Sequence, residues 1–156
     1  MTDRANEQET QVYKTSTYLN FERNTEEAFT FYKSVFGTEF IGGIMRHGDV
    51  PVAEGQPGPS DADRQLVMNV ALPIFDSHLL MGTDTPTSMG FELVQGNNVS
   101  IGLHPETRAK ADELFAALAE GGTVGVPPQV MFWGDYYGDV TDRFGVRWYV
   151  NCASSS

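Results

Sequence analysis

The chain lacks several features that would assign it to a common class of protein. Cys152 is its single cysteine, so no internal disulfide can form, and no His lies near it in the sequence to activate it as a nucleophile. Basic residues are few: 10 Lys and Arg stand against 21 Asp and Glu, a formal charge of −11. Without a Lys/Arg cluster, such a chain is repelled by nucleic-acid phosphates and by anionic membrane surfaces. We therefore expect the protein to bind neither nucleic acid nor a membrane.

Long apolar runs are also missing. No stretch approaches the roughly 18 consecutive apolar residues that a membrane span requires. Residues 1–12 lack the apolar segment of a signal peptide and predict a flexible polar tail. The expected location is therefore the cytoplasm. The remainder, residues 13–152, has the length and apolar content of a single domain with a real core.

Two amphipathic helices with the same apolar spacing are predicted, at 25–36 and at about 106–120. Asn24 and Glu27 are placed like a capping box before the first helix, and Pro105 stands in the first turn of the second. Gly37 and the pair Gly121-Gly122 would end them. The two apolar stripes lie 83 residues apart and match position for position: Ala28, Phe31, Tyr32, Val35 and Phe36, then Ala111, Leu114, Phe115, Leu118 and Ala119.

Strand-like segments flank both helices in the same order, so the chain is predicted to contain an internal duplication. Each half has the order β-α-β-β-β: module one is about 13–85 and module two about 96–152. The segment 47–64 is rich in Pro and Gly and is interpreted as a mobile loop, with a lid over a pocket as the alternative. The strands are expected at 15–21, 38–46, 66–74, 78–84, 98–104, 123–132, 136–142 and 146–151.

Alternation along the strands predicts which side chains face a pocket. Leu19 and Phe21 would pack under the first helix, and Trp148 and Val150 under the second. The opposite, concave face would then carry a mixture of aromatic, aliphatic and polar side chains, which suits a small organic ligand. The candidates for this lining are Ser16, Tyr18, Asn20, Met81, Asn98, Ser100, Trp133, Asp135, Arg147 and Tyr149.

Two segments carry a resemblance to a known family: Tyr18-Leu-Asn-Phe-Glu-Arg-Asn-Thr-Glu-Glu-Ala-Phe-Thr-Phe-Tyr32 with Phe36-Gly37, and Phe132-Trp-Gly134 with Asp142-Arg-Phe-Gly-Val-Arg-Trp148. Over about residues 13–152 the chain resembles the PhnB-like branch of the glyoxalase/bleomycin-resistance/dioxygenase (vicinal oxygen chelate) superfamily. The resemblance implies an α+β fold in which two β-α-β-β-β modules form a cupped mixed sheet, and it implies a homodimer. Some members carry a methyltransferase label, but no Gly-rich loop follows the first strand here to hold a methyl-donor cofactor.

Metal-dependent members of that superfamily place His, Glu or Gln ligands on the first and last strand of each half. Matched by alternation, these places fall on Ser16, Met81, Asn98 and Tyr149, none of which is a strong ligand. The three histidines are interpreted as a loop residue, a strand-edge residue and a helix cap. No cofactor is therefore predicted, with a divalent metal kept as an alternative. The histidines are His47, His78 and His104.

Three functional hypotheses remain, and the sequence does not decide whether the protein is an enzyme. The first is a non-catalytic binder of a small ligand, in which Trp133 and Arg147 stack a flat or anionic compound, although both residues could equally be structural. The second is a divalent-metal-dependent lyase or dioxygenase. The third is a metal-free enzyme with an Asp base from Asp135, Asp139 or Asp142, of which Asp142 is interpreted as a turn residue beside Gly145.

Overall fold

The computed structural model describes residues 13–154, so the predicted tail at 1–12 lies outside the described residues. The chain forms two compact units. The first unit comprises the described residues up to Phe91 apart from Ser34–Phe36, and the second comprises Ser34–Phe36 together with the described residues from Glu92 onward. No helix in the part of the chain that the structure describes is long and apolar enough to cross a bilayer.

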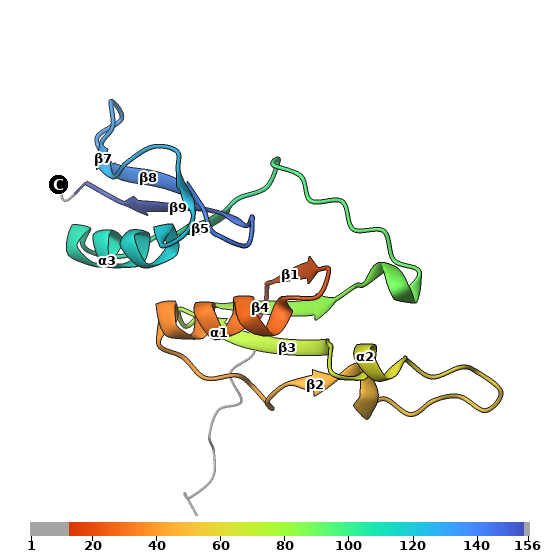
Figure 1. The fold of residues 1–156 in the computed structure, drawn as a ribbon. Helices are drawn as coiled ribbons and strands as arrows, with labels where there is room; N and C mark the ends of the chain where they lie inside the picture. Colours follow the sequence, from red (N-terminus) through yellow and green to blue (C-terminus); the bar gives the residue numbers. More distant parts are fainter. Residues whose placement is uncertain (1–12, 155–156) are drawn as a thin grey trace, which may run out of the picture. The chain divides into compact units, whose positions relative to one another are not determined.

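The first unit contains a four-stranded mixed sheet in the order β1-β4-β3-β2 (Figure 1). β1 and β4 are parallel, and the other neighbours are antiparallel. Helix α1 packs on β4, because a side chain at Gly82 would meet the ring of Phe29. The elements are β1 Ser16–Phe21, α1 Thr25–Phe36, β2 Met45–Arg46, η1 His47–Asp49, α2 Asp61–Arg64, β3 Val67–Ile74, β4 His78–Asp84 and η2 Thr87–Met89.

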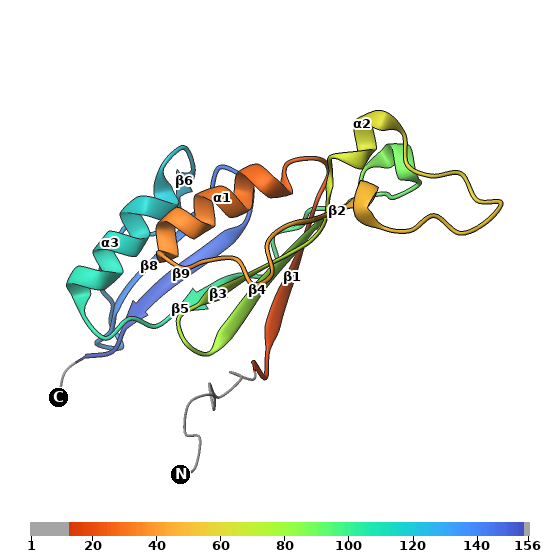
Figure 2. The ribbon, with the colours of Figure 1, turned by 90° about the horizontal axis from the view of Figure 1, so that it is seen from below.

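The second unit repeats this arrangement with the strand order β5-β9-β8-β6, and β7 also pairs with β8. Its first and last strands, β5 and β9, are again parallel. Helix α3 lies along β8 and β9 (Figure 2). The repeated β-α-β-β-β order predicted from the sequence is therefore confirmed. The elements are β5 Ile101–Leu103, α3 Arg108–Ala119, β6 Thr123–Val124, β7 Gln129–Val130, β8 Tyr136–Thr141 and β9 Arg147–Cys152.

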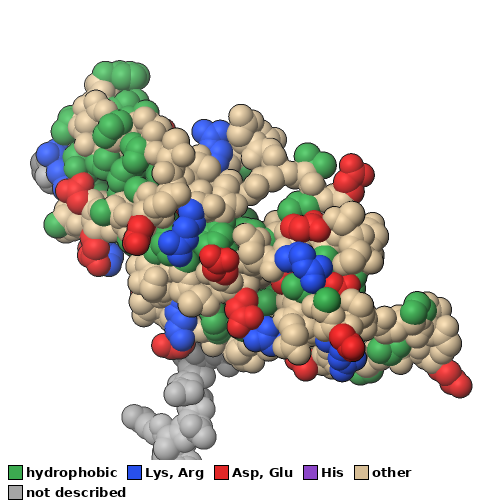
Figure 3. Space-filling view, in the orientation of Figure 1, with side chains coloured by type: hydrophobic (Ala, Val, Ile, Leu, Met, Phe, Trp, Pro, Cys, Tyr) green, Lys and Arg blue, Asp and Glu red, His purple; other side chains and the backbone are tan. Residues whose placement is uncertain are grey.

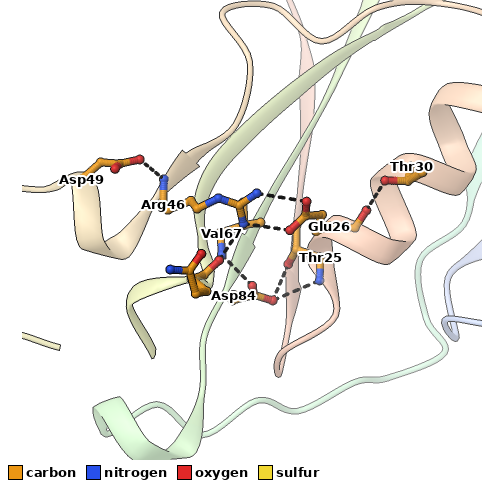
Figure 4. A network of polar contacts seen from close by, with 8 residues as sticks. Thr25, Glu26, Thr30, Arg46, Asp49, Val67 and Asp84 are labelled. Carbon is orange, nitrogen blue, oxygen red and sulfur yellow. Dashed lines mark hydrogen bonds and ion pairs between the residues drawn. The ribbon is translucent and has the colours of Figure 1, made fainter. Parts of the chain in front are cut away.

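Helix α1 has the predicted bounds, but its predicted cap is wrong. The Asn24 side chain makes no capping hydrogen bond. Instead, Asp84 at the end of β4 accepts from the Thr25 amide (3.0 Å) and hydroxyl (2.7 Å), and its other oxygen accepts from the Val67 amide (2.8 Å; Figure 4). The start of α1 is therefore bound by a carboxylate 59 residues from Thr25 in the sequence, and not by the side chain of Asn24. The second helix begins later than predicted, at Arg108, because Thr107 caps it.

Three predicted strands are shorter than expected. The segment 38–46 contributes only Met45–Arg46, since Gly42 and Gly43 both adopt positive φ and bend the chain before it. The segment 123–132 divides into β6 and β7 around two prolines, which have no amide to donate to a ladder. The segment 98–104 is a strand only over Ile101–Leu103.

The segment 47–64, predicted as a loop, begins and ends in short helices, η1 and α2. Its base is held by polar contacts within the first unit. The Arg64 guanidinium donates to the Gly48 carbonyl (3.3 Å), and Asp63, only 4% exposed, accepts from Arg23 (3.0 Å) and Ser88 (3.0 Å). His47, expected in the loop, is part of η1, and its Nε2 lies 3.2 Å from the Asp84 carbonyl.

The helix stripes form the core beneath each sheet, as their spacing predicted. Phe29, outside the predicted stripe, is also fully buried, and Val35 and Phe36 are only half-buried. Trp148 and Val150 of β9 are buried, as the alternation of that strand requires. The buried members of the two stripes are Ala28, Phe31 and Tyr32, and Ala111, Leu114, Phe115 and Leu118.

Candidate functional site

We use the term open face for the side of each sheet opposite its helix. In the first unit, alternation along β1 places Ser16, Tyr18 and Asn20 on the open face, where they are exposed. Tyr18 is paired with Met81 of β4, so the two side chains lie on the same face. The other residues that β3 and β4 contribute to this face are also uncharged: Val67, Asn69, Ala71, Pro73, Leu79 and Thr83. The predicted facing of β1 and β4 is correct, and the described residues that β1, β3 and β4 contribute to this face include no charged side chain.

The open face of the second unit is different, because β8 and β9 fill it with aromatic and charged side chains. The antiparallel register opposes Tyr137 to Asn151, Asp139 to Tyr149 and Thr141 to Arg147. All six side chains alternate with buried residues of the same strands. The predicted positions of Arg147 and Tyr149 are thus correct. The β8 residues Tyr137 and Thr141 were missed, although alternation along 136–142 could have found them.

Gly102 of β5 makes room for the ring of Tyr149. Gly102 lies opposite Tyr149 in the parallel register, and a Cβ at this glycine would lie 2.2 Å from the Tyr149 hydroxyl oxygen. The ring therefore lies across β5 and reaches His104, whose Nε2 is 3.3 Å from the Tyr149 hydroxyl. The reading of His104 as a helix cap is wrong, since Thr107 caps α3. Asn98 and Ser100 precede β5 rather than forming part of it.

Tyr149 belongs to a row of rings on the open face, which we call the aromatic row: Trp133, Tyr137, Tyr149 and His104. The Tyr137 and Tyr149 rings are stacked at 5.7 Å with 29° between their planes. Trp133 meets Tyr137 edge-on at 5.8 Å, and His104 meets Tyr149 edge-on at 5.6 Å. Trp133 is 48% exposed, so the row ends at solvent. Beside it, hydrophobic side chains gather at the β7–β8 hairpin (upper left in Figure 3), where Phe132 is 95% exposed.

Two hollows meet at Arg147 next to this row. The first is a cavity of about 140 Å³, which we call the Arg147 pocket. The second, of about 630 Å³, is a wide opening that shares Arg147 and Thr141 with the pocket and is otherwise lined by Gln95, Gly96, Asn97 and Gly145. The residues that line the Arg147 pocket include Ser100, Thr123, Tyr137, Asp139, Thr141, Arg147 and Trp148.

Arg147 is half-buried and supplies the positive charge of the pocket. Its guanidinium donates to the backbone carbonyl of Asn97. Within residues 13–154, no carboxylate lies within ion-pair distance of it. The hydroxyls of Ser100, Thr123 and Thr141 likewise make no hydrogen bond to another described residue. The pocket therefore presents several donors that the described protein does not use.

The three aspartates proposed as bases are each held by hydrogen bonds. Asp139 accepts from the Val126 amide (2.9 Å) and the Tyr137 hydroxyl (3.0 Å). Burial and the hydrogen bond to the Asp139 carboxylate raise the pKa of Tyr137 above its usual range. The Asn151 amide group donates to Asp135 and lowers the pKa of that carboxyl, which makes it a weaker base.

Asp142 is a turn residue, as predicted. It is 3% exposed and accepts from the amides of Phe144 (2.8 Å) and Val146 (3.0 Å) and from the indole of Trp148 (2.8 Å). Gly145 adopts a φ of 85°, which few other residues tolerate in this hairpin. The bonds at Asp142 therefore shape the β8–β9 connection.

The metal-ligand positions read from the resemblance do not gather acidic or imidazole side chains within either unit. Among the described residues, no three His, Cys, Asp or Glu side chains come together as a metal site would need. His78 begins β4, as predicted, and its ring lies between the hydroxyls of Thr15 (2.9 Å) and Thr17 (2.7 Å). The expectation that the protein uses no cofactor stays a prediction.

Comparison with known proteins identifies relatives across almost the whole described chain. The family model described as 3-demethylubiquinone-9 3-methyltransferase matches residues 13–151. The structure of protein PA1353 from Pseudomonas aeruginosa is 33% identical, covers 92% of this chain and 99% of its own, and superposes with a TM-score of 0.76. A Bacillus cereus PhnB protein, described as a putative 3-demethylubiquinone-9 3-methyltransferase, is 26% identical with a TM-score of 0.69, over 90% of this chain and 99% of its own.

A more distant structure extends the likeness of the fold. A glyoxalase/bleomycin resistance protein/dioxygenase family enzyme from Burkholderia phytofirmans PsJN is 16% identical, with a TM-score of 0.62 over 91% of this chain and 99% of its own. The predicted fold class, α+β with two β-α-β-β-β modules, is therefore confirmed by the sheets and by these neighbours.

Proposed function

The chain belongs to the PhnB-like family described as 3-demethylubiquinone-9 3-methyltransferase, and on that premise we propose that it binds a small organic ligand on the open face of its second unit. The observation that carries this proposal is the Arg147 pocket beside the aromatic row. A concave site with aromatic walls and a few convergent polar groups is the usual form of a small-molecule site.

The proposal does not extend to methyl transfer. A methyl-donor cofactor is commonly held by a glycine-rich turn after a first strand. Here the turn between β1 and α1 is Glu22-Arg23-Asn24, which contains no glycine. The family's descriptive name therefore gains no support from this part of the chain.

Catalysis by an aspartate base is not favoured by the geometry of the second unit. Both oxygens of Asp135, of Asp139 and of Asp142 accept hydrogen bonds from the protein, and Asp142 is only 3% exposed, so these carboxylates already serve to hold neighbouring backbone and side chains in place. We propose binding without a metal. The alternative from the family resemblance, a divalent-metal lyase or dioxygenase, is tested by metal analysis of the purified protein, where stoichiometric Zn, Ni, Mn or Fe would replace our proposal.

Two further parts of the proposal come from the sequence and the resemblance. We propose that the protein acts as a homodimer and that it resides in the cytoplasm. Sedimentation velocity at micromolar concentration tests the first, and a monomer would contradict it. Cell fractionation tests the second.

Trp133 provides a direct test of the proposed site. Trp133 is half exposed and its ring meets Tyr137, a wall of the pocket, so a ligand there should change its emission. Trp148 also borders the pocket but is fully buried, so Trp133→Phe separates the two signals. We would titrate a panel of neutral, acidic and basic naphthalene derivatives into wild-type protein and into Trp133→Phe. Saturable changes that disappear in Trp133→Phe support the site. If isothermal titration calorimetry also detects no binding by any member of the panel, the proposal is wrong.

A further inference from the structure

We propose that the ligand of the Arg147 pocket is a planar aromatic carboxylate, with its carboxylate on Arg147 and Thr141 and its ring along Tyr137. This inference rests on the proposed function and deepens it by naming the chemical class of the ligand.

The first argument is the charge of Arg147. Four other basic residues of this acidic chain pair with carboxylates: Arg23 with Asp63, Lys33 with Glu39, Arg46 with Glu26 and Lys110 with Glu113. Arg147 has no such partner in the described chain, although it is half-buried in a cavity. A guanidinium carries five donors in a planar fork that matches a carboxylate. Among residues 13–154, the bond to the Asn97 carbonyl is the one hydrogen bond of that fork, so an incoming oxyanion finds donors already in place.

The second argument is the position of the hydroxyls. Thr141 is the cross-strand partner of Arg147, and both line the two hollows, so hydroxyl and guanidinium stand on the same wall. Asp139 also lines the pocket and would repel an anion. However, Asp139 lies opposite Tyr149, which is the next pair on this face after Thr141 and Arg147, so its carboxylate is displaced along the strands from the Thr141 hydroxyl. Its two oxygens already accept from Val126 and Tyr137. The ligand carboxylate is therefore placed at the Thr141 end, away from Asp139.

The third argument is the aromatic row. Tyr137 is both a wall of the pocket and the central ring of the row, stacked on Tyr149 and edge-on to Trp133. A flat ring that enters the pocket extends this row by the same stacked or edge-on contacts. The cavity of about 140 Å³ is smaller than the roughly 300–1,000 Å³ of sites for drug-sized molecules, so a compound of one or two rings is the appropriate size.

The test compares two compounds of nearly equal shape, 2-naphthoate and the neutral 2-naphthamide. Calorimetry at pH 7 on the full chain gives both dissociation constants, and Trp133 emission reports the site. We expect the acid to bind at least about 10-fold more tightly than the amide, because hydrogen bonds between charged groups are roughly twice as strong as neutral ones. Arg147→Gln should remove this preference, and Arg147→Lys, which keeps the charge without the planar fork, should retain part of it.

The matched control is Arg143→Gln, which removes the same charge from an exposed position in the β8–β9 hairpin and should leave the preference unchanged. Circular dichroism and denaturation midpoints show whether each variant folds. The ratio of the two dissociation constants in the wild-type protein tests the preference for the acid even if a variant fails to fold. If acid and amide bind equally, or if Arg143→Gln lowers the preference as much as Arg147→Gln, the inference is wrong while the proposed site stands. If neither compound binds, the inference falls, and the outcome of the wider panel decides the fate of the proposed function.

Discussion

The two units share a strand order and a helix position but differ on their open faces. In both, the first and last strands are parallel neighbours and one helix covers the sheet with an apolar stripe. The open face of the first unit carries only uncharged side chains on β1, β3 and β4, such as Tyr18 and Met81. The open face of the second carries Arg147, Asp139 and the stacked rings of Tyr137 and Tyr149.

The difference shows that the covered face and the open face of a duplicated module are under separate physical constraints. The covered face must bury matching apolar volume, so its pattern survives in both copies. Most side chains of the open face are exposed or half-buried, and they differ between the two units. Glycine illustrates this. Gly82 admits the Phe29 ring on the covered face of one unit, and Gly102 admits Tyr149 on the open face of the other.

The largest effects are expected from matched core truncations in the two helices. Phe31 and Leu114 occupy equivalent stripe positions and are 7% and 2% exposed. We expect Phe31→Ala to cost about 3–5 kcal/mol and Leu114→Ala about 2–5 kcal/mol, because each leaves a cavity. Urea denaturation measures both. A loss below about 1 kcal/mol for either would mean that the two covered faces do not play the same role.

The next effects concern two of the buried aspartates, Asp84 and Asp142. Each accepts three hydrogen bonds, and each would leave buried donors unpaired if replaced by Ala. We expect each substitution to cost about 2–4 kcal/mol, since an orphaned buried donor costs about 1–3 kcal/mol. Chemical denaturation tests this, with exposed Asp61→Ala as the control near zero. A much smaller loss of unfolding free energy for Asp142→Ala than for Asp84→Ala would show that the β8–β9 hairpin tolerates unpaired buried donors better than the first unit does.

Substitution of the two glycines by Ala should separate stability from binding. Gly82→Ala places a Cβ 2.4 Å from the Phe29 ring in the core and should cost about 1–3 kcal/mol, as overpacking does. Gly102→Ala instead meets Tyr149, a half-buried ring that can swing away from β5. We expect this variant to keep most of its stability but to lose affinity for 2-naphthoate. If Gly82→Ala weakened binding more than Gly102→Ala in folded protein, the ligand site would not lie on the second unit.

The smallest effects are expected from the pH and salt dependence of Asp63 and Asp135. Hydrogen bonds from Arg23 in the first case and from Asn151 in the second lower the pKa of each carboxyl. The stability they contribute is therefore present above the unfolded-state pKa of about 3.9 and is lost as the pH falls through the lower folded value. Asp63→Asn and Asp135→Asn should thus differ from wild type at pH 7 and converge with it at lower pH.

Salt should distinguish these two variants. The main partner of Asp63 is a cation, whereas that of Asp135 is a neutral amide. At about 1 M salt, where the Debye length is about 3 Å, the effect of Asp63→Asn at pH 7 should shrink and that of Asp135→Asn should persist. Denaturant titrations at low and high salt measure this. Equal salt sensitivity would contradict the assignment of Arg23 as the main cause at Asp63.

Local periodicity predicted most of the fold, because it depends on neighbours in the sequence. The bounds of α1 and β4 and the alternation of β1 and β9 follow from apolar spacing alone. Contacts between distant residues were not predictable in this way. The Asp84 bond to Thr25 spans 59 residues, and no pattern near Asn24 reveals it.

The candidate site was predicted in part for the same reason. Alternation placed Arg147 and Tyr149 correctly, but it could not show that Gly102 makes room for the Tyr149 ring, nor that His104 reaches its hydroxyl. These contacts depend on the parallel pairing of β5 with β9. The sequence also could not show whether the charge of Arg147 is neutralised by a neighbouring carboxylate, because that depends on which acidic residues lie near it in the fold.

The Asp84 carboxylate joins three chain segments, because it sits at the end of β4 and holds the first amide of α1 and the first amide of β3. Neither amide can reach solvent while the carboxylate keeps both bonds. Hydrogen–deuterium exchange at Thr25 and Val67 should therefore proceed through one shared opening event, with equal protection factors that fall together when denaturant is added. The start of α1 and the start of β3 would then open together, as a single cooperative unit.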